Sequence, residues 1–319
     1  MAAITPALLD ALFRQYQFQF TSMYNATPTY WPSFASEMPS GSSENVYAWL
    51  EQFSGMRQWQ GSRQVKSAIG RDYRLTNIPF ELTVGLPRAK IADDQHGFFG
   101  AVIENMGMST KQLPDQRLSL AVEAGTTALC WDGQPFFADA HPVNLDDSSL
   151  GTYDNNLTGA SYNFLTDPKG TWAAMKAVAK KYKDGGGKPL AVVLDTVMVG
   201  PDLEDAALTL ANAQTIATTI KNVAGDQNVA AAGITNIYAG SLNIIINPFL
   251  TSDPLAVYGL CTKRAVKPFL WQNREAADFI ARTAPDDPNV FDKDEILYGS
   301  KARGAAGYGL PWTCVRAHA

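Results

Sequence analysis

Apolar residues near the start of the chain recur at the spacing of an amphipathic helix. Thr5 and Pro6 provide an N-cap residue followed by a proline at the first helical position, a combination that starts helices. The apolar residues that then fall three and four apart are Leu8, Leu9, Leu12, Phe13, Tyr16 and Phe20. They predict a helix from about residue 5, followed by an aperiodic arm over residues 21–43. The apolar stripe either packs on its own domain, which is the common fate of such faces, or docks on a neighbour.

Residues 73–84 alternate between apolar and polar positions, which is the period of a half-buried strand. The apolar members are Tyr73, Leu75, Phe80, Leu82 and Val84. A weaker strand is predicted over residues 63–69, with a turn at residues 70–72, so the two would form a long and largely polar hairpin. Because an isolated two-stranded hairpin is marginal in water, this one needs a surface on its own domain or on another subunit.

The rest of the chain mixes helical and strand patterns. Two helical stretches are expected between residues 93 and 124, where Pro114 either starts the second stretch or kinks a longer helix. A compact α/β lobe follows, with a helix, a strand and a helix over residues 171–183, 190–199 and 203–217. Strand patterns dominate after residue 234. The predicted fold class is α+β.

Length and composition are those of a globular protein with room for two domains. The chain has 319 residues, of which 46% are hydrophobic and 18% charged, so it can fill a sizeable core. Cys130, Cys261 and Cys314 lie too far apart for a CxxC metal site, and an odd number of cysteines does not fit a disulfide scaffold. The N-terminus lacks a signal-peptide pattern, and no apolar run approaches the roughly 20 residues of a membrane span. We therefore expect a soluble, cytoplasmic protein that does not bind membranes.

The overall charge argues against nucleic acid as a direct ligand. The net charge is −5 and the sequence pI is about 5.3, whereas binding by counterion release needs clustered Lys and Arg. The short basic clusters of the chain are typical of solvated helix faces and loops.

Candidate catalytic and metal-binding motifs fail on their spacing. A Gly-Lys pair ending at Lys188 lacks both the upstream glycine and the following Ser or Thr of a phosphate loop. Cys130 and His141 could meet as a thiolate pair, but no cysteine-hydrolase pattern flanks them, and a buried structural cysteine is the favoured interpretation. Asp292 and Asp294 begin like a calcium loop that lacks its glycine and its distal glutamate. We therefore expect no catalytic residues, no cofactor and no metal, and hence no enzyme.

Six segments of the chain carry a family resemblance when they are taken in order. They are YAWLEQFSGMRQWQGSRQVK (47–66), RDYRLTNIPFELTVGLPRAKIADDQHG (71–97), CWDGQPFFADAHP (130–142), KPLAVVLDTVMVGPDLEDAA (188–207), RAVKPFLWQNR (264–274) and EILYGSKARGAAGYGLPW (295–312). Together they resemble the Mu-like phage major head subunit family. The resemblance covers most of the chain and weakens before residue 45 and between about residues 208 and 255.

This resemblance implies the Hong Kong 97-type phage capsid fold. Residues 1–52 would form the N-arm, and residues 53–90 the extended loop, a β-hairpin that reaches over a neighbouring subunit. Residues 91–150 and 256–319 would form a discontinuous peripheral domain with its spine helix. The axial domain would comprise residues 151–255.

The function implied by the resemblance is that of a major head protein of a tailed phage or prophage. Copies of the chain would self-assemble as pentamers and hexamers into an icosahedral shell in the bacterial host cytoplasm, and the shell would become part of the virion. Scaffold, portal and decoration proteins would be its partners, and packaged DNA would lie inside without sequence-specific binding. The expected contact residues between subunits are Leu12, Phe13, Tyr16, Arg63, Val65, Tyr73 and Leu75.

Two other functions stay open at this point. A cellular, encapsulin-like nanocompartment shell would share the fold, and genomic neighbours would distinguish it from a phage head. An α/β enzyme would need a concave pocket with convergent titratable groups, and the sequence does not indicate one.

Overall fold

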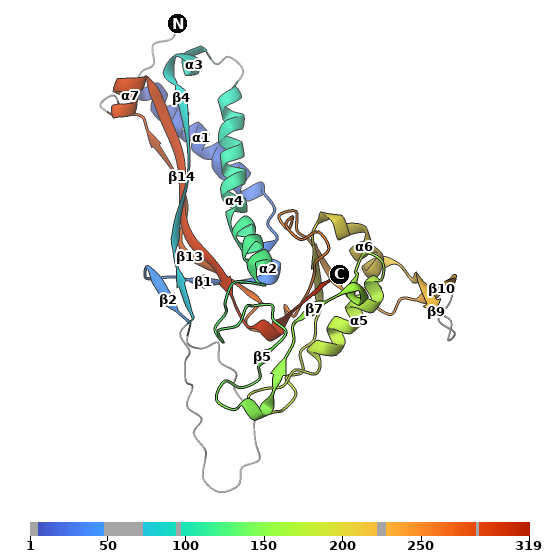
Figure 1. The fold of residues 1–319 in the computed structure, drawn as a ribbon. Helices are drawn as coiled ribbons and strands as arrows, with labels where there is room; N and C mark the ends of the chain where they lie inside the picture. Colours follow the sequence, from blue (N-terminus) through green and yellow to red (C-terminus); the bar gives the residue numbers. More distant parts are fainter. Residues whose placement is uncertain (1–5, 48–72, 94–96, 222–227, 285–286) are drawn as a thin grey trace.

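The structure is a computed structural model that describes residues 6–47, 73–93, 97–221, 228–284 and 287–319. It has an elongated part, built on long strands and two long helices, and a compact lobe beside it (Figure 1). The α-helices are α1 (Pro6–Ala26), α2 (Trp31–Phe34), α3 (Arg88–Asp93), α4 (Phe98–Ala124), α5 (Pro168–Ala179), α6 (Glu204–Asn212) and α7 (Pro288–Lys293). Short 3-10 helices occupy Ser148–Leu150, Ala160–Tyr162, Pro201–Leu203 and Pro311–Thr313. The strands are β1 (Ala35–Pro39), β2 (Glu44–Val46), β3 (Arg74–Thr76), β4 (Ile78–Pro87), β5 (His141–Pro142), β6 (Thr152–Tyr153), β7 (Asn156–Thr158), β8 (Thr196–Val199), β9 (Thr215–Lys221), β10 (Asn228–Thr235), β11 (Asn243–Ile246), β12 (Val257–Leu260), β13 (Phe269–Arg282), β14 (Glu295–Tyr308) and β15 (Cys314–His318).

A four-stranded sheet in the order β1-β13-β14-β4 forms the elongated part. β1 runs parallel to β13, while the other two pairs are antiparallel. Helices α1 and α4 pack against each other and against this sheet (Figure 1). The mixture of long strands and helices agrees with the predicted α+β class.

Helix α1 begins at Pro6, as the sequence predicts, and packs on its own chain. The Tyr16 ring meets Tyr298 of β14 edge-on, with 5.1 Å between the ring centroids. The Phe20 ring lies 5.0 Å from Phe279 of β13. Of the two alternatives for this apolar stripe, the described chain thus uses its own domain.

Helix α4 runs over 27 residues and keeps Pro114 in its interior. One of the two sequence interpretations, in which Pro114 starts a second helix, is therefore wrong, because Pro114 lies inside one continuous helix. An interior proline costs a helix about 3 kcal/mol, because it lacks an N–H group and clashes with the preceding turn. The helix is anchored on both sides of it, by Met106 in the core with α1 and by Leu118 in a second core, and both side chains are almost fully buried. Burial of such side chains stabilises by about 1.5–3 kcal/mol each, so tertiary packing outweighs the proline.

The strand predicted over residues 73–84 is present, but its partners differ from the predicted hairpin. Strand β4 pairs with β14 along its whole length, from Ile78 opposite Gly304 to Pro87 opposite Glu295. Strand β3 pairs with β2. The other predicted arm, residues 63–69, lies outside the described residues. Part of the segment expected to form the extended loop thus belongs to the long sheet.

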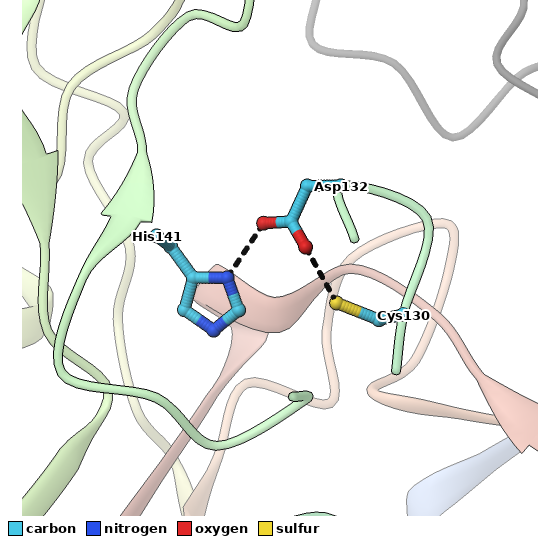
Figure 2. A group of neighbouring side chains, drawn as sticks. All are labelled: Cys130, Asp132 and His141. Atoms are coloured by element: carbon cyan, nitrogen blue, oxygen red, sulfur yellow. Dashed lines mark hydrogen bonds and ion pairs between the residues drawn. The ribbon is translucent and has the colours of Figure 1, made fainter. Parts of the chain in front are cut away.

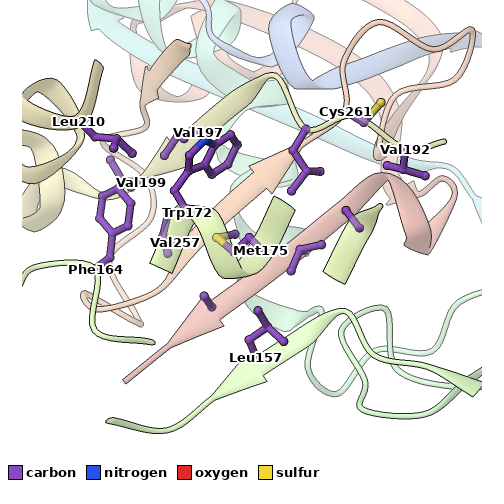
Figure 3. Close-up of a cluster of buried hydrophobic side chains, with 14 of the residues drawn as sticks. Leu157, Phe164, Trp172, Met175, Val192, Val197, Val199, Leu210, Val257 and Cys261 are labelled. Carbon is purple, nitrogen blue, oxygen red and sulfur yellow. The ribbon is translucent and has the colours of Figure 1, made fainter. Parts of the chain in front are cut away.

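The compact lobe holds a five-stranded sheet in the order β11-β8-β12-β15-β7. Its core contains Trp172 and Met175 of α5, which pack beside Val197 and Val199 of β8 and Val257 of β12 (Figure 3). The predicted helices over 171–183 and 203–217 correspond to α5 and α6, but α6 ends at Asn212 because strand β9 follows. Strands β9 and β10 pair as a separate ribbon that projects from the lobe (Figure 1).

Strands β12 and β15 belong to residues 256–319, the segment expected to share a domain with residues 91–150. Both strands lie inside the five-stranded sheet of the lobe, whereas β13 and β14 lie in the long sheet. All four residues of β12 are buried, as are the first four of β15, which is typical of central strands. The chain therefore crosses between the two sheets before β13 and again after β14.

Gly107 allows α1 and α4 to approach closely, and we predict that Gly107→Ala destabilises the protein. A Cβ atom at this position would lie 2.6 Å from the backbone oxygen of Phe20, so the helix backbones would have to separate. We expect a net loss of about 1–3 kcal/mol, even though alanine is the better helix former. Urea unfolding of the unassembled subunit measures the change.

Gly100→Ala is the matched control for this prediction. It lies on the same helix, and its Cβ would meet only the side-chain amide of Gln19, which can move. Its effect should stay within about 1 kcal/mol. Equal losses in the two variants would contradict the close-approach argument.

Candidate functional site

Three of the predicted contact residues lie on helix α1 and face the long sheet of their own chain. Tyr16 is buried, and Leu12 and Phe13 are partly buried against the same core. The Phe13 ring stacks on Phe279 with 5.8 Å between centroids. These side chains therefore already have neighbours within the chain.

Tyr73 and Leu75, two further predicted contacts, also pack on their own chain. The Tyr73 hydroxyl accepts a hydrogen bond from the backbone N–H of Tyr308 at 3.0 Å, and burial raises the pKa of Tyr73 to about 12. Leu75 is buried. The remaining two, Arg63 and Val65, lie outside the described residues. Contacts of all seven with other subunits stay predictions.

The two flanks of segment 48–72 are hydrogen-bonded to each other. The backbone N–H of Tyr47 donates to the carbonyl oxygen of Tyr73 at 2.8 Å. Strands β2 and β3 continue this pairing, from Val46 opposite Arg74 to Glu44 opposite Thr76. The segment therefore leaves and re-enters the described structure at one point (Figure 1). We call this point the loop base.

A buried polar network fixes the loop base to strand β13. Gln272 is fully buried, its Oε1 accepts from the Tyr47 hydroxyl at 2.8 Å, and its Nε2 donates to Asn77 Oδ1 at 2.6 Å. Asn77 Nδ2 in turn donates to the carbonyl oxygen of Ser42 at 2.7 Å. Buried polar groups in folded proteins are generally hydrogen-bonded, because an unpaired one destabilises the fold. Sequence reasoning missed the network, although a glutamine next to the apolar run 269–271 was a usable signal.

Cys130, Asp132 and His141 meet in a buried loop between α4 and β5 (Figure 2). His141 Nδ1 lies 2.6 Å from Asp132 Oδ2, and the Cys130 thiol donates to Asp132 Oδ1 at 3.0 Å. The other ring nitrogen of His141, Nε2, lies 3.2 Å from the carbonyl oxygen of Phe136. The sequence had suggested that Cys130 and His141 could meet, and the structure places the Asp132 carboxylate between them.

This arrangement does not activate Cys130 as a nucleophile. Burial, followed by the charge of Asp132, raises the pKa of the Cys130 thiol, whereas a reactive cysteine needs a lowered one. Burial by itself would raise the pKa of Asp132 too, but hydrogen bonding to His141 and the other donors lower it. The cluster therefore favours a charged Asp132 carboxylate, held by hydrogen bonds, beside a protonated Cys130 thiol.

The C-terminal half of α4 joins the long sheet to the lobe. Glu123 accepts hydrogen bonds from the backbone N–H groups of Thr251 and Ser252, both at 2.7 Å. Ser119 Oγ accepts from Asn247 Nδ2 at 2.8 Å. These contacts bring the loop after β11 against the helix and tie the two sheets together.

Asp115 on α4 holds the N-terminal arm. Its buried carboxylate Oδ1 accepts from the backbone N–H groups of Tyr30 at 3.0 Å and Trp31 at 2.6 Å, where the short helix α2 starts. Burial raises the pKa of Asp115, while the hydrogen bonds from Trp31 and Tyr30 oppose the shift. Asp115 thereby ties the start of α2 to the long helix, in addition to the packing of α1 on α4.

We predict that Asp115→Ala lowers the free energy of unfolding by about 1–3 kcal/mol, because two buried N–H groups lose their acceptor. Asp115→Asn keeps an acceptor oxygen and should lose less. Since the folded-state pKa of Asp115 is raised, the stability of the wild type relative to Asp115→Asn should fall as the pH rises from 3.8 through that pKa. Urea unfolding of both proteins between pH 4 and 7 measures this difference. A difference that grows with pH would contradict the prediction.

Several large apolar side chains among the described residues stay exposed. The most exposed are Phe18 of α1 at 74%, and Phe98 of α4 and Ile237 at 71% each. Phe98 and Val102 lie one turn apart on α4. Side chains of this size that stay exposed together are candidates for burial by another molecule.

No helix in the described part of the chain combines the length and the apolar character needed to cross a membrane.

Comparison with known proteins gives one family and several related capsids. The family described as Mu-like prophage major head subunit gpT matches residues 9–169 and 247–319. The major capsid protein of Escherichia phage Mu is 25% identical over 309 residues, which cover 96% of this chain and 72% of that protein. The Mu-like prophage FluMu major head subunit of Haemophilus influenzae is 31% identical over 310 residues, which cover 97% and 73%.

A solved structure agrees with these relatives. The procapsid of bacteriophage JBD30 is similar with a TM-score of 0.57 and 26% sequence identity, and the match covers 99% of this chain and 76% of that chain. The likeness extends through both sheets of the structure.

Proposed function

Because the chain belongs to the Mu-like prophage major head subunit family, we propose that many copies of it close into the icosahedral shell of a tailed-phage head. The chain is a major capsid protein with the Hong Kong 97-type fold. The observation that carries the proposal is the joint match, along nearly the whole chain, to a phage head subunit and to a procapsid.

The two sheets suggest how the subunit is divided in the shell. The long sheet with α4 would be the peripheral domain, with α4 as its spine helix. The five-stranded lobe would be the axial domain, close to the axes of pentamers and hexamers. Segment 48–72 and its loop base would be the extended loop that overlaps a neighbour. Each subunit would then share its buried area with several copies, so that many weak contacts add up to a stable shell.

The predicted contact residues take two roles in this proposal. Arg63 and Val65, inside segment 48–72, would touch the neighbour directly. Tyr16 and Leu75 are buried in their own chain and would act by holding helix α1 and the loop base in place. Leu12, Phe13 and Tyr73, which are only partly buried, would keep one side for a neighbour.

Scaffold, portal and decoration proteins would be the partners of assembly, and packaged DNA would lie inside the shell. A net charge of −5 favours a lining that does not bind DNA tightly, because tight binding without sequence preference needs clustered basic residues.

The two alternative functions have less support. A phage head subunit is favoured over a cellular nanocompartment because both curated relatives are phage or prophage head proteins. An enzyme is disfavoured because the family and both relatives are head-shell proteins.

Electron microscopy and analytical ultracentrifugation of the purified protein, with and without its scaffold and portal partners, test the proposal. We expect closed particles. A chain that stays monomeric under every assembly condition, with those partners present, would refute it.

A further inference from the structure

We propose that Cys130, Asp132 and His141 form a binding site for a divalent transition metal ion, with zinc as the best fit. Their ligand atoms, one thiol sulfur, one carboxylate oxygen and one imidazole nitrogen, all lie within 4.8 Å of one another in the loop between α4 and β5 (Figure 2). A sulfur, nitrogen and oxygen set of this kind suits zinc.

The orientation of His141 is that of a metal ligand. Its Nε2 faces the carbonyl oxygen of Phe136 at 3.2 Å, and because a carbonyl only accepts, Nε2 carries the proton. Once the proton between Nδ1 and Asp132 is displaced, the lone pair of Nδ1 is directed toward Asp132 and the cluster. Metal-bound histidines commonly fix their tautomer by donating the other N–H to a backbone carbonyl in this way.

The hydrogen bonds inside the cluster show what the ion would replace. Nδ1 and the Asp132 carboxylate lie 2.6 Å apart, so one proton lies between them, and a second proton joins the Cys130 sulfur to the same carboxylate. A divalent cation that displaces both protons leaves the net charge of the buried cluster unchanged. The two positive charges of the ion therefore replace the two protons and are balanced by the Cys130 thiolate and the Asp132 carboxylate, so the buried site gains no net charge.

Tyr153 provides an independent observation at the same place. Its ring stacks on His141 with 5.0 Å between centroids, and its buried hydroxyl has no hydrogen-bond partner among the described residues. An unpaired buried hydroxyl is costly. Three protein ligands leave a fourth position of a zinc ion open for water, and water is a hydrogen-bond partner of the kind that the Tyr153 hydroxyl lacks among the described residues.

The fit requires only small movements. Zinc bonds of about 2.0–2.3 Å in a tetrahedron separate neighbouring ligand atoms by roughly 3.3–3.8 Å. The present separations are 2.6 Å from His141 Nδ1 to Asp132 Oδ2 and 3.0 Å from Cys130 Sγ to Asp132 Oδ1, and the sulfur and imidazole nitrogen lie within 4.8 Å of each other, so each pair shifts by roughly 1.5 Å or less. All three ligands lie on one loop between residues 130 and 141, which can make this adjustment without moving either sheet.

Cobalt binding followed by absorption spectroscopy tests the site, because a thiolate bound to Co²⁺ gives a charge-transfer band in the near ultraviolet. We expect one ion per chain, displaced by Zn²⁺, and a band that is lost in Cys130→Ala. Cys261→Ala, which removes another buried free cysteine, is the control and should keep the band. Asp132→Asn and His141→Gln should weaken Co²⁺ binding by at least about 100-fold. Circular dichroism confirms that each variant is folded.

Three results would overturn the proposal. They are a wild-type chain that takes up no Co²⁺ or Zn²⁺ after chelator dialysis, a Cys130→Ala variant that keeps the band, and folded Asp132→Asn and His141→Gln variants that bind Co²⁺ as tightly as the wild type.

Discussion

Replacing residues 48–72 by a two-residue glycine linker is expected to leave the subunit folded and to abolish shell formation. The flanks of the segment are already hydrogen-bonded, with Tyr47 N–H and Tyr73 O 2.8 Å apart, so a short linker closes the chain at little entropic cost. Within the described residues, the Gln272 network ties the loop base to strand β13. The deleted residues would instead supply contacts to neighbours.

Circular dichroism of this variant measures folding, and sedimentation and electron microscopy measure shell formation. We expect an unchanged fold, a subunit or small oligomer in solution, and no closed particles. A replacement of the same segment by Gly and Ser residues of equal length is the control for loop length, and it should also fail to assemble. Normal particles from the shortened chain would show that segment 48–72 is not an assembly element.

Trp172→Ala is expected to lower the free energy of unfolding by about 3–5 kcal/mol, the largest single-residue effect that we predict. The Trp172 side chain is fully buried at the centre of the lobe core, beside Met175, Val197 and Val257 (Figure 3). Its removal leaves a cavity next to Gly259 of β12, which lies against the ring and has no side chain that could fill the space.

Trp172→Phe is the informative companion to that variant. The Trp172 N–H has no hydrogen-bond partner in the described part of the chain, so phenylalanine removes a buried unpaired donor while it keeps most of the apolar volume. We expect a loss clearly smaller than that of alanine. Urea unfolding of the unassembled subunit measures both, and equal losses would contradict the argument.

Local patterns predicted the elements of this fold better than their partners. The apolar stripe after Pro6 gave the start of α1, and the alternation over residues 73–84 gave a strand. Alternation shows which side of a strand is apolar, but it carries no information about the strand that pairs with it. Strand β4 therefore has a partner, β14, more than 200 residues away in the sequence.

Pro114 illustrates a conflict between local preference and packing. Propensity alone disfavours a helix through this residue, and only the two cores on either side of it decide the outcome.

Cys130 and His141 show how far the candidate site could be predicted from the sequence. Their meeting could be suggested from residue types, whereas the carboxylate between them, and the carbonyl that orients His141, depend on how the loop closes.

The position of β15 has a consequence for protein synthesis. Strand β15 pairs with β12 on one side and β7 on the other, and it is made after every other strand of the sheet. Until residues 314–318 have emerged from the ribosome, β12 and β7 lack the strand that lies between them in the folded sheet. A chain cut short before residue 314 by a nonsense codon or a stalled ribosome lacks the strand that joins them. We therefore expect that chains truncated before residue 314 do not complete the five-stranded sheet and are not built into a shell.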